Sequence, residues 1–267
     1  MGIASVNGIN VSFDDVGTGN NVLVLVHGHP FDRSMWNPQL AASRQWGWRA
    51  IAPDLRGYGD SSIVPGTTTL DLFAGDIAAL LDHLGVSEIV IGGLSMGGQI
   101  VMEFCRLYPQ RVRGLILAAT FPKAETEEGK YDRRTMADLL ILEGMEEYAE
   151  KTLPKMLAPR SITTLPEVAS KVLSMMRAAK PSGAAAALRG RAERRAYEET
   201  LASLNIPALI VVGAEDAFTT RADAEGMRDL LKGSELIWLE GVGHMPNLED
   251  EASFNAALER FLGRLPL

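Results

Sequence analysis

The chain has 267 residues, 34 of them acidic and 26 basic, which gives a formal net charge of −8 at pH 7. This acidic balance argues against nucleic acid as a partner, because phosphate binding needs a surface rich in Lys and Arg. The length fits either two small domains or one large α/β domain that carries an insertion, and the single cysteine, Cys105, favours a reducing compartment such as the cytoplasm.

At its start the chain has neither the basic region nor the apolar region of a signal peptide, and its apolar runs are too short to span a bilayer. We therefore expect no secretion signal and no membrane partner. Residues 2–6 and 10–16 alternate in polarity around Asn7-Gly8 and predict an antiparallel hairpin at a sheet edge.

Short apolar runs bounded by Gly, Pro or Asp follow along the chain and are typical of buried strands. They span residues 22–26, 49–53, 88–91, 114–118, 208–212 and 235–239. Helical patterns lie between them, over residues 71–84, 95–108 and 253–262. This alternation predicts an α/β fold with a mostly parallel central sheet flanked by helices.

The alternation stops between residues 121 and 200, where helix-like stretches are separated by prolines. We expect a core domain of residues 1–120 and 201–267, with residues 121–200 inserted as a helical segment. The methionines of this segment suit ordinary helix packing, with an adaptable pocket lining as the alternative. Its basic residues alternate with glutamates, which predicts a solvated helix face. These basic residues are Arg189, Arg191, Arg194 and Arg195.

The motif Gly93-Leu94-Ser95-Met96-Gly97 has the form G-x-S-x-G and directly follows a predicted buried strand. By itself the motif is weak, but a strand before it and a helix after it are the setting that a nucleophilic serine in a strained turn requires. The two glycines would let the backbone close around Ser95. The following helix would place its positive end beside developing negative charge.

A serine hydroxyl needs a general base, and the chain offers four histidines. His83 lies near the end of a predicted helix and is expected to face solvent. His27 ends a central strand, where a structural hydrogen-bonding role is expected. His244 follows the last predicted strand in a glycine-rich loop, which makes it the predicted base.

A carboxylate must hold the imidazole, and both Glu215 and Asp216 follow the strand at residues 208–212. We choose Asp216. The order Ser95, Asp216, His244 is the nucleophile, acid, base order of the α/β-hydrolases and differs from that of chymotrypsin or subtilisin.

Several segments together resemble the α/β-hydrolase superfamily. They are His27-Gly28-His29-Pro30, the run from Pro53 to Ser61, the run from Gly93 to Gly98, and the loops that carry the acid and the histidine. The chain looks most like cap-bearing bacterial carboxylesterases. Enol-lactonases, cofactor-free haloperoxidases or perhydrolases, and acyl-homoserine lactonases are its neighbours.

The resemblance implies that residues 121–200 form a helical cap, or lid, over the active site. It also implies an oxyanion hole made by the backbone N–H groups of His29 and Met96. The role of the His29 side chain is left open.

From these observations we predict a serine hydrolase, without metal or cofactor, that cleaves carboxylic esters of short to medium acyl chain through an acyl-enzyme. Phe121, Phe218 and Met245 are expected to line an apolar pocket, which favours uncharged substrates. The alternatives are a lactonase, a perhydrolase or haloperoxidase, and a ligand sensor with slow turnover. The expected partner is a small-molecule ester or lactone, and monomer and homodimer both stay open.

Overall fold

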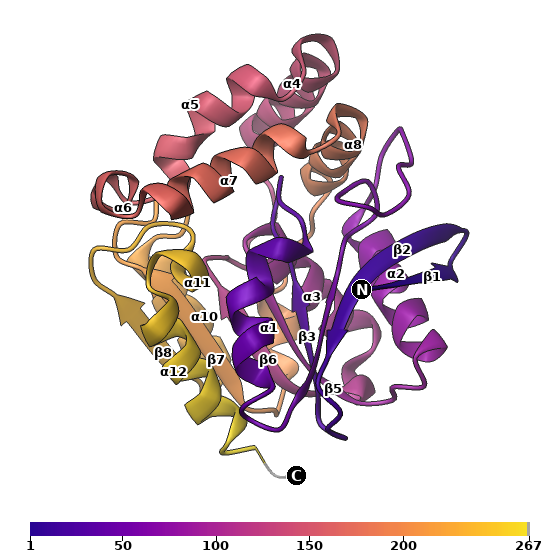
Figure 1. The fold of residues 1–267 in the computed structure, drawn as a ribbon, viewed down its shortest axis with the longest axis vertical. Coiled ribbons are helices and arrows are strands. Elements are labelled where there is room, and N and C mark those ends of the chain that lie inside the picture. Colours follow the sequence, from indigo (N-terminus) through magenta and orange to yellow (C-terminus); the bar gives the residue numbers. More distant parts are fainter. Residues whose placement is uncertain (266–267) are drawn as a thin grey trace.

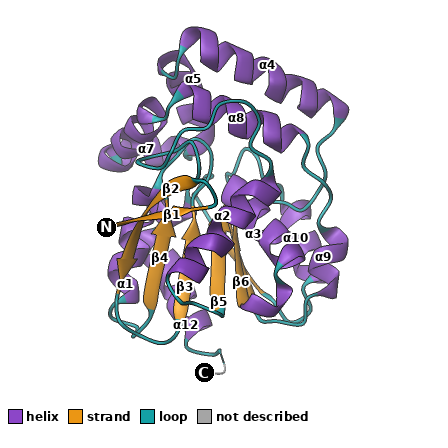
Figure 2. Ribbon diagram, turned by 90° about the vertical axis from the view of Figure 1, so that its right-hand side faces the viewer, coloured by secondary structure: helices purple, strands orange, loops and turns teal. Residues whose placement is uncertain are grey.

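A computed structural model describes residues 1–265 of the chain. An eight-stranded sheet forms its centre, in the order β1-β2-β4-β3-β5-β6-β7-β8 (Figures 1 and 2). The strands are β1 (Gly2–Val6), β2 (Ile9–Val16), β3 (Val22–Val26), β4 (Arg49–Pro53), β5 (Ile89–Leu94), β6 (Val112–Ala118), β7 (Ala208–Gly213) and β8 (Glu235–Leu239). Within residues 1–265, β2 runs antiparallel to both of its neighbours, β1 and β4, and the other neighbouring pairs are parallel. The predicted mostly parallel sheet with a hairpin at one edge is confirmed.

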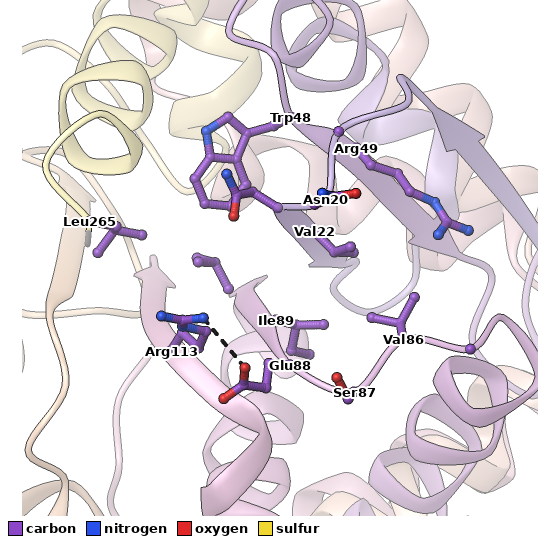
Figure 3. Close-up of a pocket in the computed structure, with 14 residues that line it drawn as sticks. Asn20, Val22, Trp48, Arg49, Val86, Ser87, Glu88, Ile89, Arg113 and Leu265 are labelled. Carbon is purple, nitrogen blue, oxygen red and sulfur yellow. Dashed lines mark hydrogen bonds and ion pairs between the residues drawn. The ribbon is translucent and has the colours of Figure 1, made fainter. Parts of the chain in front are cut away.

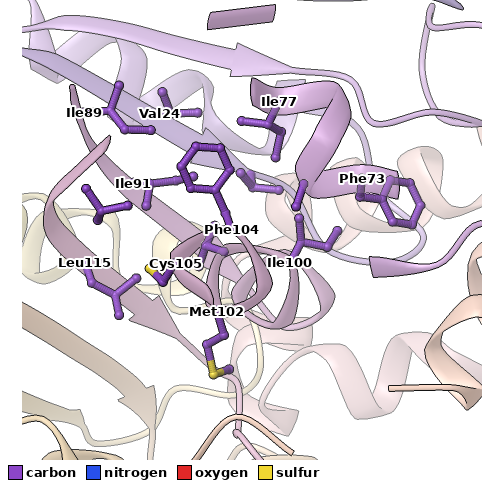
Figure 4. Packing of buried hydrophobic residues seen from close by; sticks show 14 of the residues in the cluster. Val24, Phe73, Ile77, Ile89, Ile91, Ile100, Met102, Phe104, Cys105 and Leu115 are labelled. Atoms are coloured by element: carbon purple, nitrogen blue, oxygen red, sulfur yellow. The ribbon is translucent and has the colours of Figure 1, made fainter. Parts of the chain in front are cut away.

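Helices cover both faces of the sheet, and successive side chains along a strand point to opposite faces. Val24 of β3 belongs to one buried cluster, together with side chains of α2 (Leu70–His83) and α3 (Met96–Leu107). Figure 4 shows this packing around Phe104. Leu23 and Leu25 belong to a second cluster, which includes side chains of α1 (Asn37–Ser43) and α12 (Glu251–Leu262). Alternate side chains of β3 therefore pack into two apolar layers, one on each side of the sheet, as a parallel sheet buried on both faces requires.

The segment between β6 and β7 is helical. It contains α4 (Glu127–Glu143), α5 (Glu146–Met156), α6 (Pro159–Thr164), α7 (Pro166–Ala178), α8 (Pro181–Ala192) and α9 (Glu198–Ser203). Figure 1 shows α4 to α8 grouped beyond one end of the sheet, whereas α9 lies beside α10 (Arg221–Leu230) in Figure 2. The last helix of the segment thus packs with the helices that cover the sheet.

The prediction of a solvated basic face on α8 and the turn after it is wrong for two of its arginines. Arg191 is 8% exposed and Arg194 is 3% exposed. The run Ala184–Ala187 and neighbouring glycines are buried, so α8 packs closely against other parts of the chain and turns Arg191 inward. Arg195 is exposed and Arg189 is half-buried.

Candidate functional site

Ser95 lies in a sharp turn between β5 and α3. Its φ of 57° and ψ of −116° fall in a region that residues with a side chain seldom adopt. The turn is held at both ends, because Ser95 N–H donates to the Ala118 carbonyl at 3.0 Å and Thr120 Oγ1 donates to the Ser95 carbonyl at 2.8 Å. The backbone strain expected from the G-x-S-x-G motif is therefore present at Ser95.

The glycines on either side of Ser95 are needed for close approach. A Cβ on Gly93 would collide with the backbone of Gly97, and a Cβ on Gly97 would collide with the Val26 carbonyl oxygen. A side chain on Gly97 would thus push the serine turn away from β3, and a side chain on Gly93 would force the two ends of the turn apart.

His244 and Asp216 lie together in the loops after β8 and β7. His244 Nδ1 lies 2.9 Å from Asp216 Oδ1 and 3.0 Å from Oδ2, and both side chains are buried. The two loops are joined by the Glu215 N–H, which donates to the Val242 carbonyl at 2.8 Å. Glu215 itself is exposed, so Asp216 is the carboxylate that the fold delivers to the imidazole.

The environment of Asp216 favours its ionised form. Burial alone would raise the pKa of Asp216, but the His244 imidazole and the N–H groups of Phe218 and Thr219 outweigh it, so the pKa lies below the ordinary carboxyl value. An ionised Asp216 accepts a hydrogen bond from the protonated Nδ1 of His244 and leaves Nε2 as the nitrogen available to a serine hydroxyl.

The loop after β3 lies against the serine turn. β3 pairs with β5 through Val26 and Gly93, and a Cβ on Gly28 would meet Ser95 Cβ at 3.3 Å. His29 follows Gly28 in this loop, and Met96 is the first residue of α3 directly after Ser95. The two residues expected to supply backbone N–H donors therefore belong to segments that meet at Ser95.

A cavity of about 460 Å³ lies between the strand ends and the helical segment. Ser95, His29 and His244 line it from the core, and residues of α4, α5 and α8 line it from the helical segment. The predicted serine and histidine thus line one cavity, and Asp216 is hydrogen-bonded to that histidine.

Two of the three predicted pocket residues line this cavity. Phe121 lies under the Arg194 guanidinium at 5.0 Å, and the Phe218 ring lies 4.7 Å from that of His244. Met245 is completely buried and is not in the lining, where Met136 and Met156 occur instead. The lining also contains Arg133, Lys155 and Arg191 and is therefore less apolar than the sequence suggested.

Sequence reasoning missed Glu249, which supports the His244 loop. Its Oε1 accepts the N–H groups of Gly243 at 3.0 Å and Met245 at 3.1 Å, and its Oε2 accepts the Ala158 N–H at 2.8 Å. It thereby ties the histidine loop to the junction of α5 and α6. No local pattern marks Glu249, because its partners are backbone groups.

The other histidine predictions agree with the structure. His27 is fully buried, its Nε2 accepts the Leu55 N–H at 3.0 Å and its Nδ1 lies 2.9 Å from the Gly28 carbonyl. Burial lowers the pKa of His27, so it stays neutral as a structural residue. His83 is exposed at the end of α2.

A second hollow of about 260 Å³ lies at the amino ends of β3, β4 and β5 (Figure 3). An ion pair between Arg113 and Glu88 borders it, and none of the predicted site residues lines it. Across residues 1–265, no group of three or more His, Cys, Asp or Glu side chains is placed to hold a metal ion. No helix within that range is both long and apolar enough to cross a bilayer.

Comparisons with known proteins find similar sequences and similar structures. The model of the alpha/beta hydrolase family matches residues 23–257. Among curated proteins, 3-oxoadipate enol-lactonase 2 of Acinetobacter baylyi is 30% identical, over 86% of this chain and 84% of its own length.

Among solved structures, a thermophilic esterase from Thermogutta terrifontis with malate bound superposes with a TM-score of 0.95. It is 36% identical, and the match covers 98% of this chain and 97% of that one. The enol-lactonase of Burkholderia xenovorans LB400 superposes with a TM-score of 0.90 at 25% identity, over 98% of this chain and all of its own.

Proposed function

This chain belongs to the alpha/beta hydrolase family, and from that premise we propose that it is a serine hydrolase that cleaves carboxylic esters of short to medium acyl chain. The observation that carries the proposal is the buried pair of His244 and Asp216, which opens on the same cavity as the strained Ser95. The esterase and enol-lactonase relatives support hydrolysis of an acyl-oxygen bond.

In the proposed mechanism Ser95 Oγ attacks the acyl carbon while His244 Nε2 takes its proton. The negative charge that develops on the carbonyl oxygen is stabilised by the backbone N–H groups of Met96 and His29, and removing one such donor typically costs about 3 to 4 kcal/mol of barrier. His244 then returns the proton to the leaving alcohol. Ser95 is left as an acyl-enzyme.

Water enters the same site in the second half of the cycle. His244 takes a proton from that water, the hydroxide attacks the acyl carbon, and the protonated imidazole returns the proton to Ser95 Oγ as the acid departs. Asp216 stays ionised throughout and stabilises the imidazolium in both halves. No metal or cofactor is required by this scheme.

We further propose that residues 121–200 act as a cap over the reaction. Its helices supply much of the cavity lining, and the His244 N–H donates to the Met156 carbonyl at 3.2 Å. A cap that touches the base loop in this way excludes bulk water from the acyl-enzyme and limits the size of the acyl group. The cytoplasmic location stays a prediction, and monomer and homodimer both stay open.

A lactonase is the second candidate, because the curated enol-lactonase matches most of the chain. A lactone is an internal ester, and the same three side chains would open it. A serine site of this kind also allows perhydrolysis and the sensing of a ligand with slow turnover.

A substrate panel on one preparation separates these functions. We expect steady hydrolysis of nitrophenyl esters from acetate to octanoate, with turnover of about 1 s⁻¹ or faster. If the protein opens lactones faster than it cleaves these esters, it is a lactonase. If it forms peracids from peroxide, it is a perhydrolase. Release of only one equivalent of nitrophenol per chain would indicate a sensor. Ser95→Ala should abolish turnover, and wild-type rates in that variant would refute the mechanism.

A further inference from the structure

Arg191 is a buried cation on the wall of the cavity. It is 8% exposed, and its Nε donates to Gln99 Oε1 at 3.2 Å. Among residues 1–265, no carboxylate lies within ion-pairing distance of its guanidinium. A buried charge without a partner is costly for a fold, and such groups are normally paired or bind a ligand of opposite charge.

The surroundings of Arg191 add positive charge. Arg133 and Arg194 both pair with Glu125, the second through Nη1 at 3.5 Å, so one carboxylate serves two guanidiniums and none is left for Arg191. Burial, together with Arg133 and Arg194, lowers the pKa of Arg191 well below its ordinary value. An anion bound in the cavity would raise the pKa of Arg191 again, because it would stabilise the charged guanidinium. The acidic residue in the lining, Asp132, is exposed on α4.

His29 offers a second donor beside Arg191. Its Nδ1 lies 2.7 Å from Tyr58 Oη, while its Nε2 is buried without a partner among the described residues. Burial and the neighbouring Arg191 lower the pKa of His29 well below its ordinary value, so the ring is neutral. Burial also raises the pKa of Tyr58, whose phenol keeps its proton. When Tyr58 donates to Nδ1, Nε2 carries a proton that it can donate.

Arg191 is held close to the reacting serine. Gln99, which fixes the Arg191 side chain, lies one helical turn after Ser95, and its N–H donates to the Ser95 carbonyl at 3.2 Å. Ser95 and Arg191 also line the same cavity, so an acyl group on Ser95 shares that space with the guanidinium.

We propose that Arg191, with His29 beside it, binds a free carboxylate carried by the substrate. The substrate is then a short-chain ester or lactone that bears a carboxylate, such as a half-ester of a short dicarboxylic acid. This inference rests on the proposed serine hydrolase function and sharpens its substrate class. It replaces the sequence-based expectation of uncharged substrates.

The test compares monomethyl glutarate with its uncharged isostere, methyl glutaramate, by methanol release at fixed pH and ionic strength. We expect the wild-type kcat/KM to be at least tenfold higher for the charged ester. Arg191→Gln should lower the ratio of the two kcat/KM values by 10- to 100-fold, and Arg191→Lys should lower it less. Arg189→Gln is the matched control, because Arg189 lies on the same helix and pairs with Asp138 at 2.7 Å. The control should keep the wild-type ratio.

Equal kcat/KM values for the charged and the uncharged ester, both in this pair and in a second pair whose charge lies in the alcohol half, would overturn the proposal. So would a preference that Arg191→Gln leaves unchanged. A parallel pair, 4-acetoxybutanoate and its amide, carries the charge in the alcohol half. A preference confined to this pair, and lost in Arg191→Gln, supports the subsite and places the carboxylate on the leaving alcohol.

Glutarate binding measured by calorimetry separates this proposal from the proposed function. We expect wild-type protein and Ser95→Ala to bind glutarate and Arg191→Gln to bind it at least tenfold more weakly. Arg191-dependent binding without hydrolysis of any ester would refute the serine hydrolase and keep the subsite. Ester hydrolysis without glutarate binding or charge preference would keep the hydrolase and refute the subsite.

Discussion

Glu249 should be essential for the stability of the loop that carries His244. Glu249 as a whole is 9% exposed, and its carboxylate accepts three backbone N–H groups, from Gly243, Met245 and Ala158. In Glu249→Gln the amide oxygen can still accept the first two, but the amide nitrogen then faces the Ala158 N–H, and two donors oppose each other.

The loss of stability in Glu249→Gln follows from the hydrogen bond that the Ala158 N–H no longer makes. A hydrogen bond to a charged acceptor contributes about 1.5 to 3 kcal/mol, and a buried donor left without a partner costs about 1 to 3 kcal/mol. Because these two figures partly describe the same lost contact, they do not add in full, and we expect Glu249→Gln to lower the free energy of unfolding by about 2 to 4 kcal/mol. We also expect kcat to fall more than KM changes, because His244 loses its fixed position while the cavity wall persists.

Urea denaturation followed by circular dichroism measures the first effect, and steady-state ester hydrolysis measures the second. Glu259→Gln, at an exposed glutamate of α12, is the control for loss of charge. A Glu249→Gln protein that unfolds within about 0.5 kcal/mol of the control, the range of ordinary surface changes, would refute the reasoning.

Three further predictions concern other parts of the chain. Asp216→Asn should keep the fold and the KM while kcat falls by about 10³- to 10⁴-fold, as in other serine hydrolases that lose the acid; a loss below tenfold would contradict its role. Because the pKa of Asp216 is lowered by folding, its ionised form stabilises the protein above about pH 4, and this contribution is lost as the pH falls through the folded pKa. Urea midpoints between pH 6 and pH 3 should therefore fall less steeply for Asp216→Asn than for wild type, and parallel curves would count against this. Burial raises the pKa of the Cys105 thiol to about 12, so a thiol reagent should modify it only in denaturant, and rapid labelling of the native protein would show that α3 is exposed.

The sheet and the serine turn could be predicted because their signals are local. The apolar run Val22–Val26 is a strand over the same residues, and the G-x-S-x-G motif forms the strained turn after β5. A strand buried on both faces and a glycine needed for close approach each leave a mark in adjacent residues.

The pocket could not be predicted in the same way, because its walls come from distant segments. The pattern of arginines and glutamates after residue 188 is typical of a solvated helix, yet Arg191 contacts Gln99, which is 92 residues away in the sequence. Met245 adjoins His244 in the chain but is buried, while Met156 approaches the site from α5. Position next to a site residue in the sequence is therefore a poor guide to the lining.

The central claim is that Ser95 is the nucleophile of an ester-cleaving site. The most direct measurement is treatment of the protein with a nitrophenyl alkylphosphonate, followed by mass spectrometry of its peptides and an assay of ester hydrolysis. We predict one equivalent of nitrophenol released per chain, the phosphonyl group on Ser95, loss of hydrolysis in proportion, and no reaction in Ser95→Ala. Labelling at another residue, or full esterase activity in a chain whose Ser95 is modified, would contradict it.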